Sequence, residues 1–187
     1  MRQKLRVLGV TEDTSFVVAG GRLAFYNLMD SLASVGNDVT VLSCTGATED
    51  LVDTRRLNSI RLRVSPSRIV GPITFLAKLF LLLPKRLLTC DVLVVNSGYP
   101  LPEAVALAKV TGKKVVVLQH DAHNLETVEK FAASTSRKYM AIVRWILMYP
   151  PLRLVDGILC VTDSTRRGVM SLGVTTRAFV IGNTIKE

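Results

Sequence analysis

The sequence predicts a doubly wound α/β domain, built on a mainly parallel, seven-stranded, Rossmann-like sheet with helices on both faces. Short apolar runs recur along the chain, segments with helical periodicity lie between them, and turns containing Gly separate the two kinds of segment. Near-continuous apolar runs are typical of parallel strands that are covered on both faces. A length of 187 residues suits a single domain of this kind.

The elements follow the chain in order. We expect strands at Leu5–Val10, Val39–Cys44, Ile60–Val64, Val92–Asn96, Val115–His120, Gly157–Val161 and Ala178–Ile181. We expect helices after Gly21 and at Phe75–Leu82, Glu103–Val110, Val128–Met148 and Thr165–Leu172. Gly36 and Gly112 end two of these helices, and Asp163 and Ser164 can cap the last one. Open sheets of this type bind ligands at the carboxyl ends of their strands, so the loops there are the place to look for a site.

The charge of the chain is strongly basic. Lys and Arg number 24 against 15 Asp and Glu, and the net charge of +9 attracts phosphates, anionic lipids or nucleic acid without selecting among them. The arginines between positions 55 and 68 lack interleaved aromatic residues, so we expect no nucleic-acid partner. Cys44, Cys90 and Cys160 lie in or beside apolar runs without metal-ligand spacing. We therefore expect reduced, structural cysteines in a cytosolic protein, with no metal and no cofactor.

Two segments bear on membrane insertion. Met1–Leu8 leads directly into a predicted strand and has neither the apolar region nor the cleavage site of a signal peptide. The apolar segment Ile69–Leu88 is nearly long enough to cross a bilayer, but Lys78 interrupts it and a proline lies near each end. We do not expect it to span a membrane.

The first loop at the carboxyl edge ends in Gly20-Gly21 and opens directly into a helix. Backbone N–H groups at such a helix N-terminus suit a phosphate. The spacing is neither that of the dinucleotide-binding pattern G-x-G-x-x-G nor that of a Walker A loop. The alternative is that the two glycines only make a tight start to the helix.

Two further loops carry candidate site residues. His120 ends the fifth predicted strand and Asp121 follows it, where an imidazole can donate to a hydroxyl or phosphate oxygen and a carboxylate can orient a hydroxyl. His120 could instead bond only to loop backbone, and His123 could be a surface residue or a helix cap. The loop with Ser97 and Tyr99 can line a ligand pocket or be a plain turn.

The order of these motifs resembles a known family. Ala19–Leu42 is similar to the opening of GT-B glycosyltransferases of the large retaining family 4 (glycosyltransferase group 1), in which a Gly-Gly loop and a helix precede L-x-x-x-G-H-x-V-x-V. Asn37 stands where that His is common, and Arg22 follows the glycines in place of a small or apolar residue. Further matches follow in chain order at Asp91–Asn96, Gln119–Asp121, Val155–Ser164 and Phe179–Thr184, the last with Gly182 for Pro and Thr184 for Gly.

The resemblance implies that the chain, residues 1–187, is the N-terminal, acceptor-binding half of a hexosyltransferase-type enzyme that acts with retention. Its donor would be a nucleotide-diphosphate sugar, held mainly by a C-terminal donor-binding domain in cis or in trans that this chain lacks. His120 and Asp121 would then be catalytic, and Gly20 and Gly21 would bind the donor phosphates. Ser97, Tyr99 and His123 would bind the acceptor.

Two apolar segments with flanking cations, 69–88 and 137–153, have the composition of interfacial helices. The alternative is that both are core helices. The expected membrane contacts are Phe75, Lys78, Lys85, Arg86, Arg137, Lys138, Arg144 and Trp145. The sequence therefore favours a peripheral protein at the cytoplasmic face of an anionic membrane, with a lipid-linked or other membrane acceptor. The alternative function is a non-catalytic membrane-anchoring subunit that recruits a separate donor-binding catalytic partner.

Overall fold

The computed structural model describes residues 4–12, 20–44, 56–64, 70–98, 100–120 and 149–182. The strands are β1 (Arg6–Val10), β2 (Asp38–Cys44), β3 (Asn58–Leu62), β4 (Val92–Asn96), β5 (Lys114–Gln119), β6 (Gly157–Cys160) and β7 (Ala178–Val180). The helices are α1 (Gly20–Ser34), α2 (Val70–Thr89), α3 (Leu101–Val110) and α6 (Asp163–Ser171). The predicted helix Val128–Met148 lies outside the described residues.

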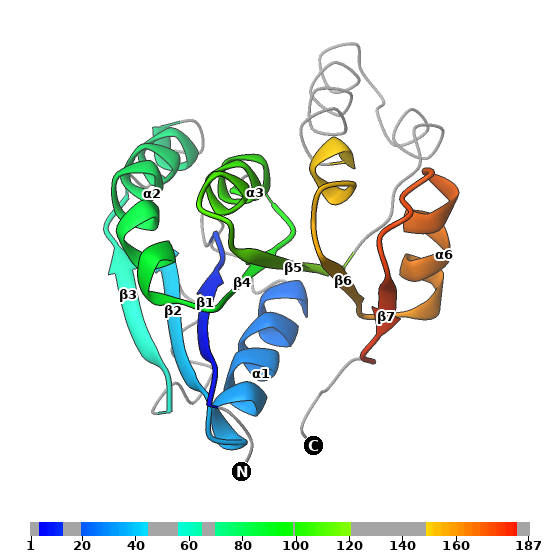
Figure 1. Ribbon diagram of the computed structural model, residues 1–187, viewed down its shortest axis with the longest axis horizontal. Helices are drawn as coiled ribbons and strands as arrows, with labels where there is room; N and C mark the ends of the chain where they lie inside the picture. The colour runs from blue at the N-terminus through cyan, green and yellow to red at the C-terminus, as the bar shows by residue number, and fades with distance from the viewer. Residues whose placement is uncertain are drawn as a thin grey trace.

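All seven strands form one sheet in the order β3-β2-β1-β4-β5-β6-β7, and every neighbouring pair is parallel (Figure 1). The predicted doubly wound fold is confirmed. The strand order reverses between β1 and β4, which pair directly with Val10 beside Val95. Such a switch point opens a crevice at the carboxyl ends of the two strands, so the topology itself marks where a ligand fits.

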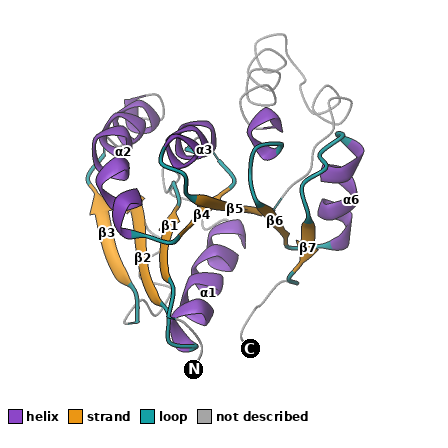
Figure 2. Ribbon diagram, viewed as in Figure 1, coloured by secondary structure: helices purple, strands orange, loops and turns teal. Residues whose placement is uncertain are grey.

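The sheet is covered on both faces (Figure 2). Helices α2 and α3 pack on one face, with Leu8, Leu93 and Val117 of the strands in the same cluster. Helix α1 packs on the other face, where Phe25 and Met29 meet Val94 and its neighbours. Successive strand residues point to opposite faces, and both sets are apolar because both faces are buried.

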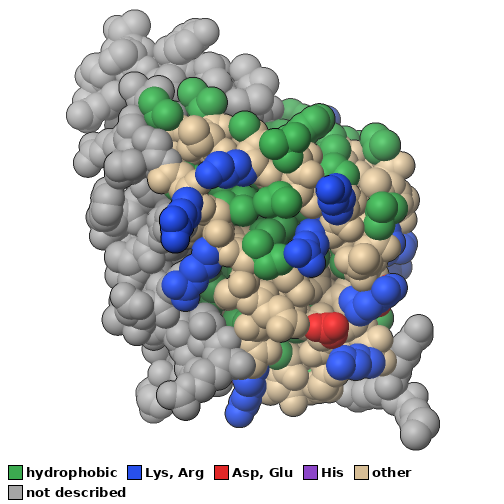
Figure 3. Space-filling model, turned by 90° about the vertical axis from the view of Figure 1, so that its left-hand side faces the viewer, with side chains coloured by type: hydrophobic (Ala, Val, Ile, Leu, Met, Phe, Trp, Pro, Cys, Tyr) green, Lys and Arg blue, Asp and Glu red, His purple; other side chains and the backbone are tan. Residues whose placement is uncertain are grey.

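Helix α2 buries one stripe and exposes another. Phe75, Leu79, Leu83 and Leu87 recur every fourth residue and are fully buried against the sheet. This corrects the expectation that Phe75 contacts a membrane: its side chain lies in the core. Figure 3 shows the outer surface over α2 and β3, where apolar side chains gather among Lys and Arg side chains.

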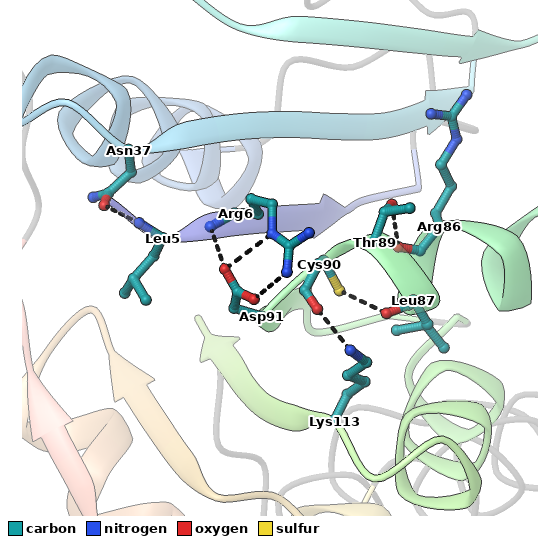
Figure 4. A network of polar contacts seen from close by, with 9 residues as sticks. All are labelled: Leu5, Arg6, Asn37, Arg86, Leu87, Thr89, Cys90, Asp91 and Lys113. Atoms are coloured by element: carbon teal, nitrogen blue, oxygen red, sulfur yellow. Dashed lines mark hydrogen bonds and ion pairs between the residues drawn. The ribbon is translucent and has the colours of Figure 1, made fainter. Parts of the chain in front are cut away.

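The amino edge of the sheet is held by ionic and capping contacts (Figure 4). Asp91 accepts from the backbone N–H of Arg6 at 2.8 Å and forms an ion pair with its guanidinium at 2.7 Å. These contacts, led by the side-chain hydrogen bond from Arg6, lower the pKa of Asp91 to about 2. Asn37 accepts from the N–H of Leu5 and donates to the carbonyl of Leu32. Asn37 therefore joins α1 to Leu5, the residue before β1, at the edge opposite the carboxyl ends.

Some boundaries differ from the prediction. Strand β3 begins and ends two residues earlier than expected, because its pairing with β2 starts at Asn58 beside Thr40. The cap of α6 is Thr162, whose side chain accepts from the N–H of Thr165, and not Asp163 or Ser164, which lie inside the helix. Gly36 and Gly112 follow their helices with positive φ, as a helix-ending Gly does.

Within the described residues, no helix has the length and apolarity needed to cross a membrane. The same part of the chain holds no group of His, Cys, Asp and Glu residues that could bind a metal. Cys44, Cys90 and Cys160 are buried as free thiols, in agreement with the structural role expected for them.

Candidate functional site

A cluster of polar residues lies at the carboxyl edge, around the switch point between β1 and β4. Thr11 directly follows β1, Asn96 ends β4 and His120 directly follows β5. Because β1, β4 and β5 are consecutive neighbours in the sheet, these side chains come from adjacent strand ends. Gly20 and Gly21 begin α1 at the same edge. The fold thus brings three strand ends and the start of α1 to one edge of the sheet.

The imidazole of His120 lies directly against the backbone of Gly21. A Cβ atom at position 21 would stand 2.8 Å from both Cγ and Cδ2 of the ring and 3.2 Å from Nδ1. Real Cβ atoms do not approach other atoms so closely, so only Gly allows the ring this position. His120 and Gly21, both expected at the carboxyl edge, are therefore in contact in the structure.

Asn96 connects His120 to Thr11. Its Oδ1 lies 2.5 Å from Nε2 of His120, and its Nδ2 donates to Oγ1 of Thr11 at 3.0 Å. Thr11 is fully buried and Asn96 is 6% exposed, so water competes little for these bonds. The N–H of Thr11 donates to the carbonyl of Leu42 on β2, and this bond fixes Thr11 to the sheet.

The backbone of His120 is held from the opposite side. The hydroxyl of Thr165, in the first turn of α6, donates to the carbonyl oxygen of His120 at 3.0 Å. Thr165 is itself held by Thr162, because the two hydroxyl oxygens lie 2.9 Å apart and the N–H of Thr165 donates to the Thr162 hydroxyl. His120 is therefore fixed at its ring by Asn96 and at its main chain by α6.

Carboxyl groups add acidic character to this edge. Glu12 follows Thr11, and a Cβ at Gly98 would stand 2.8 Å from its Oε1, so the carboxylate lies over the β4 loop. Glu103 occupies the first turn of α3, and burial raises the pKa of its carboxyl group above the ordinary value. Glu12 follows the end of β1 and Glu103 lies at the start of α3, so both groups belong to the carboxyl edge.

The structure brings some of the predicted site residues together and does not describe others. Gly21 and His120 are in contact, and Gly20 is the first residue of α1. Ser97 extends the pairing of β4 with β5, since its N–H donates to the carbonyl of Leu118 at 2.9 Å. The residues Tyr99, Asp121, His123, Arg137, Lys138, Arg144 and Trp145 lie outside the described part of the chain.

Sequence reasoning missed Thr11, Glu12 and Asn96 as site residues. Thr11 and Asn96 share one signal, which is a polar residue at the end of an otherwise apolar strand. In a doubly wound sheet, buried polar side chains at that position lie beside the crevice.

The assembled cluster offers an imidazole, a carboxylate and the N–H groups at the start of α1, which have no acceptor within the helix. Such groups suit sugar hydroxyls and phosphate oxygens.

Comparison with known proteins identifies the class. The model of the family described as Glycosyltransferase Family 4 matches residues 18–186. The chain therefore belongs to glycosyltransferase family 4, with the fold of an N-terminal GT-B domain. No curated protein sequence matches it.

Solved structures share this fold at low sequence identity. UGT2 of Phytolacca americana, complexed with UDP-2fluoro-glucose and pterostilbene, superposes with a TM-score of 0.70 at 11% identity, over 100% of this chain and 56% of that one. Anabaena Alr3699/HepE in complex with UDP gives a TM-score of 0.60 at 15% identity, over 96% and 44%. A putative UDP-N-acetylglucosamine 2-epimerase from Listeria monocytogenes gives 0.65 at 11% identity, over 98% and 46%. The chain thus spans about half the length of these structures, and such identities establish the fold alone.

Proposed function

We propose that this chain is the acceptor-side half of a retaining glycosyltransferase that transfers a sugar from a nucleotide-diphosphate sugar to a membrane-associated acceptor. The observation that carries the proposal is the contact between His120 and Gly21 at the carboxyl edge. It brings an imidazole beside the first turn of α1, whose N–H groups have no acceptor within the helix, and such groups suit a sugar next to a phosphate. Membership of glycosyltransferase family 4 supports the reaction class.

The proposal divides substrate binding between two domains. The donor base and ribose would bind to a C-terminal domain, in cis or in trans, while this chain closes over the donor phosphates and holds the acceptor. The neighbours solved with UDP or a UDP-sugar support a donor of that kind. His120 would act on sugar hydroxyls during transfer, and Asp121 and Ser97 would help to orient the two substrates.

The outer face of α2 supports a membrane-associated acceptor. The exposed apolar residues of this helix are between 47% and 71% exposed, and they are Val70, Ile73, Phe80, Leu81 and Leu88. Ile73, Phe80 and Leu88 follow helical spacing, so they form one stripe along the helix. Lys78, Lys85 and Arg86 of the same helix are exposed as well. Lys78 also donates to the carbonyl of Arg63 and thereby links α2 to the end of β3.

An apolar stripe with flanking cations matches an anionic bilayer, in which apolar side chains insert and cations meet headgroups. Each cation contributes roughly 1 kcal/mol near an anionic surface. This attraction fades beyond a Debye length of about 8 Å at physiological salt, so insertion of Phe80 and Leu81 is needed as well. We place the protein at the cytoplasmic membrane face on these grounds.

Vesicle co-sedimentation tests the membrane surface. The parent chain should sediment with anionic vesicles at low salt, and less with neutral vesicles or at high salt. Lys85→Gln with Arg86→Gln should weaken the partitioning by about 30-fold, the equivalent of two cations. The matched control is Lys4→Gln with Arg177→Gln, which removes the same charge from exposed positions outside α2. Equal losses in the two variants, or a parent that stays in the supernatant, would contradict this surface.

The same assay tests the apolar residues by comparing the pair Phe80→Gln and Leu81→Gln with the pair Val35→Gln and Val110→Gln. All four side chains are exposed, but only the first two belong to α2. Only the α2 pair should lose vesicle binding, because only those side chains insert. Equal behaviour of the two pairs would indicate that binding does not use the outer face of α2.

An assay of sugar transfer distinguishes the proposed enzyme from the alternative, a non-catalytic anchoring subunit. The gene product, together with any separate donor-binding partner, is incubated with labelled nucleotide sugars and membrane lipids. Labelled lipid whose formation depends on His120 supports the enzyme. Formation that needs this chain only for vesicle recruitment, and is unchanged in His120→Ala, supports the non-catalytic alternative.

A further inference from the structure

The carboxylate of Glu12 lies across the switch point of the sheet. Glu12 belongs to the loop after β1, and Gly98 belongs to the loop after the neighbouring strand β4. A Cβ atom added at Gly98 would lie 2.8 Å from Oε1 and 2.9 Å from Cδ of Glu12. The carboxylate of the first loop therefore contacts the backbone of the second, at the crevice where doubly wound sheets bind ligands.

The backbone conformation of Gly98 does not require a glycine. Its φ lies outside the left-handed region, which residues with a side chain rarely adopt. The missing Cβ instead leaves space for the carboxylate of Glu12. Gly21 leaves the same kind of space for the imidazole of His120. Two glycines at the carboxyl edge thus each accommodate one polar side chain.

These two polar side chains lie beside helix starts of different charge. His120 contacts the start of α1, whose first turn has no acidic residue. Glu12 contacts the loop that leads into α3, whose first turn contains Glu103. The N–H groups at the start of α1 suit a phosphate, whereas a carboxylate repels one. One side of the crevice, at α1, therefore suits anions, and the side at α3 disfavours them.

Glu12 is able to bind a ligand in addition to its contacts within the protein. The residue is partly exposed, so a ligand can reach it. The two oxygens of a carboxylate offer about four acceptor positions, so a bond to the protein leaves others available. A carboxylate accepts hydrogen bonds and donates none. Its partner must therefore supply hydrogens, as sugar hydroxyls do and a fully ionised phosphate does not.

We propose that Glu12 is a specificity-determining residue that selects an acceptor bearing sugar hydroxyls and excludes a lipid phosphate as the acceptor group. The hydroxyls donate to the carboxylate on the α3 side of the crevice, while the donor phosphates bind at the start of α1. The acceptor is then a lipid that already carries a sugar. This inference rests on the proposed function, because it concerns the acceptor of the same transfer.

Titration with inorganic phosphate tests the charge separation without any transfer. The protein is labelled with nitrogen-15 glycine, and NMR follows the amide signals of Gly21 and Gly98 at about pH 8, where phosphate is mainly doubly ionised. Gly21→Ala and Gly98→Ala assign the two signals. We expect phosphate to shift the signal of Gly21 and not that of Gly98.

In Glu12→Gln, phosphate should shift the Gly98 signal as well, because the repelling charge is gone. The matched control is Asp38→Asn, which removes an exposed carboxylate at the start of β2, on the opposite edge of the sheet, and should behave as the parent. A parent in which phosphate shifts Gly98, or shifts neither signal, would overturn the proposal. So would equal responses in the parent and Glu12→Gln.

The linkage of the transferred sugar identifies the acceptor group. The gene product, with any donor-binding partner it requires, transfers a labelled sugar to membrane lipids. The lipid product is then treated with mild acid, which cleaves a sugar from a phosphate but not from another sugar. We expect the label to remain attached to a further sugar. Release of the labelled monosaccharide would refute the selection of hydroxyls, whereas the absence of any labelled lipid would contradict the proposed function instead.

Kinetics test the position of the carboxylate. Glu12→Gln should raise the KM for the acceptor by about tenfold or more, the equivalent of one charge-assisted hydrogen bond, and leave the KM for the donor unchanged. Gly98→Ala should also raise the acceptor KM, because its methyl group displaces the carboxylate and retains the charge. The matched control is Gly157→Ala, and amide spectra verify that each variant is folded. An unchanged acceptor KM in folded Glu12→Gln and Gly98→Ala would show that Glu12 does not select the acceptor.

Discussion

Gly21 and His120 are in direct contact. A Cβ atom added at residue 21 would lie only 2.8 Å from Cγ and from Cδ2 of the imidazole ring. The contact joins the start of α1 to the residue after β5, two segments that are far apart in the sequence. It explains why a helix begins with a residue of poor helix propensity: any larger residue would displace the imidazole.

Gly21→Ala tests this contact. At an ordinary helix position the change would stabilise the fold by up to about 1 kcal/mol. Here the added methyl group must push the His120 ring away, so we expect a loss of stability in urea unfolding instead. The matched control is Gly157→Ala, where a Cβ would meet only Val116 at an ordinary 3.9 Å and stability should be retained. A stabilised Gly21→Ala would show that the ring does not occupy this position.

Thr165 holds the backbone of His120 from α6, and its loss should loosen the site. Thr165→Val keeps the shape of the side chain but leaves the carbonyl of His120 without its hydroxyl donor. We expect a destabilisation of about 1–3 kcal/mol in chemical unfolding. Thr165→Ser retains the hydroxyl and should lose less. If Thr165→Ser were less stable than Thr165→Val, packing of the methyl group would contribute more to stability than the hydrogen bond.

The lowered pKa of Asp91 predicts that the stability of the fold depends on pH. The folded-state pKa of about 2 lies below the ordinary value of 3.8, so the folded state favours the charged carboxylate. The stabilisation is fully present above about pH 4 and is lost as the pH falls towards 2. In Asp91→Asn the thermal midpoint should be lower at neutral pH and should fall less between pH 4 and 2 than in the parent. Parallel curves for the two proteins would contradict the role of the Arg6 contact.

Phe75 and Phe80 lie on the same helix but on opposite surfaces of it. Phe75 is fully buried, so Phe75→Ala should cost about 3–5 kcal/mol in urea unfolding. Phe80 is 58% exposed, so Phe80→Ala should change stability by no more than about 0.5 kcal/mol and should instead reduce vesicle binding. A large loss of stability from Phe80→Ala would mean that its side chain packs in a core.

Much of the fold could be predicted because apolar runs and glycine turns report local structure directly. The seven strands appear where the runs are, and the parallel arrangement follows from burial on both faces. Strand β3 was placed two residues late because it is a half-polar strand at the sheet edge, so its register depends on pairing with β2 and not on apolarity. The cap at Thr162 was missed because it depends on where β6 ends.

The site was harder to predict than the fold. His120 and Gly21 could be placed at one edge because every parallel strand ends there. The contacts of Thr11 and Asn96 depend on which strands are neighbours in the sheet, and a single sequence does not show this. Phe75 was assigned to a membrane surface because the composition of α2 does not show which stripe faces the sheet.

The central claim is that His120 acts in sugar transfer, and the kinetics of His120→Ala test it most directly. The gene product, with any donor-binding partner it requires, is assayed for transfer from nucleotide sugars to a membrane acceptor. We predict transfer by the parent and a decrease in kcat of around 10²-fold in His120→Ala, with the fold intact by circular dichroism. A near-normal kcat in a folded His120→Ala variant, or a parent that converts the nucleotide sugar without any acceptor, would contradict the account.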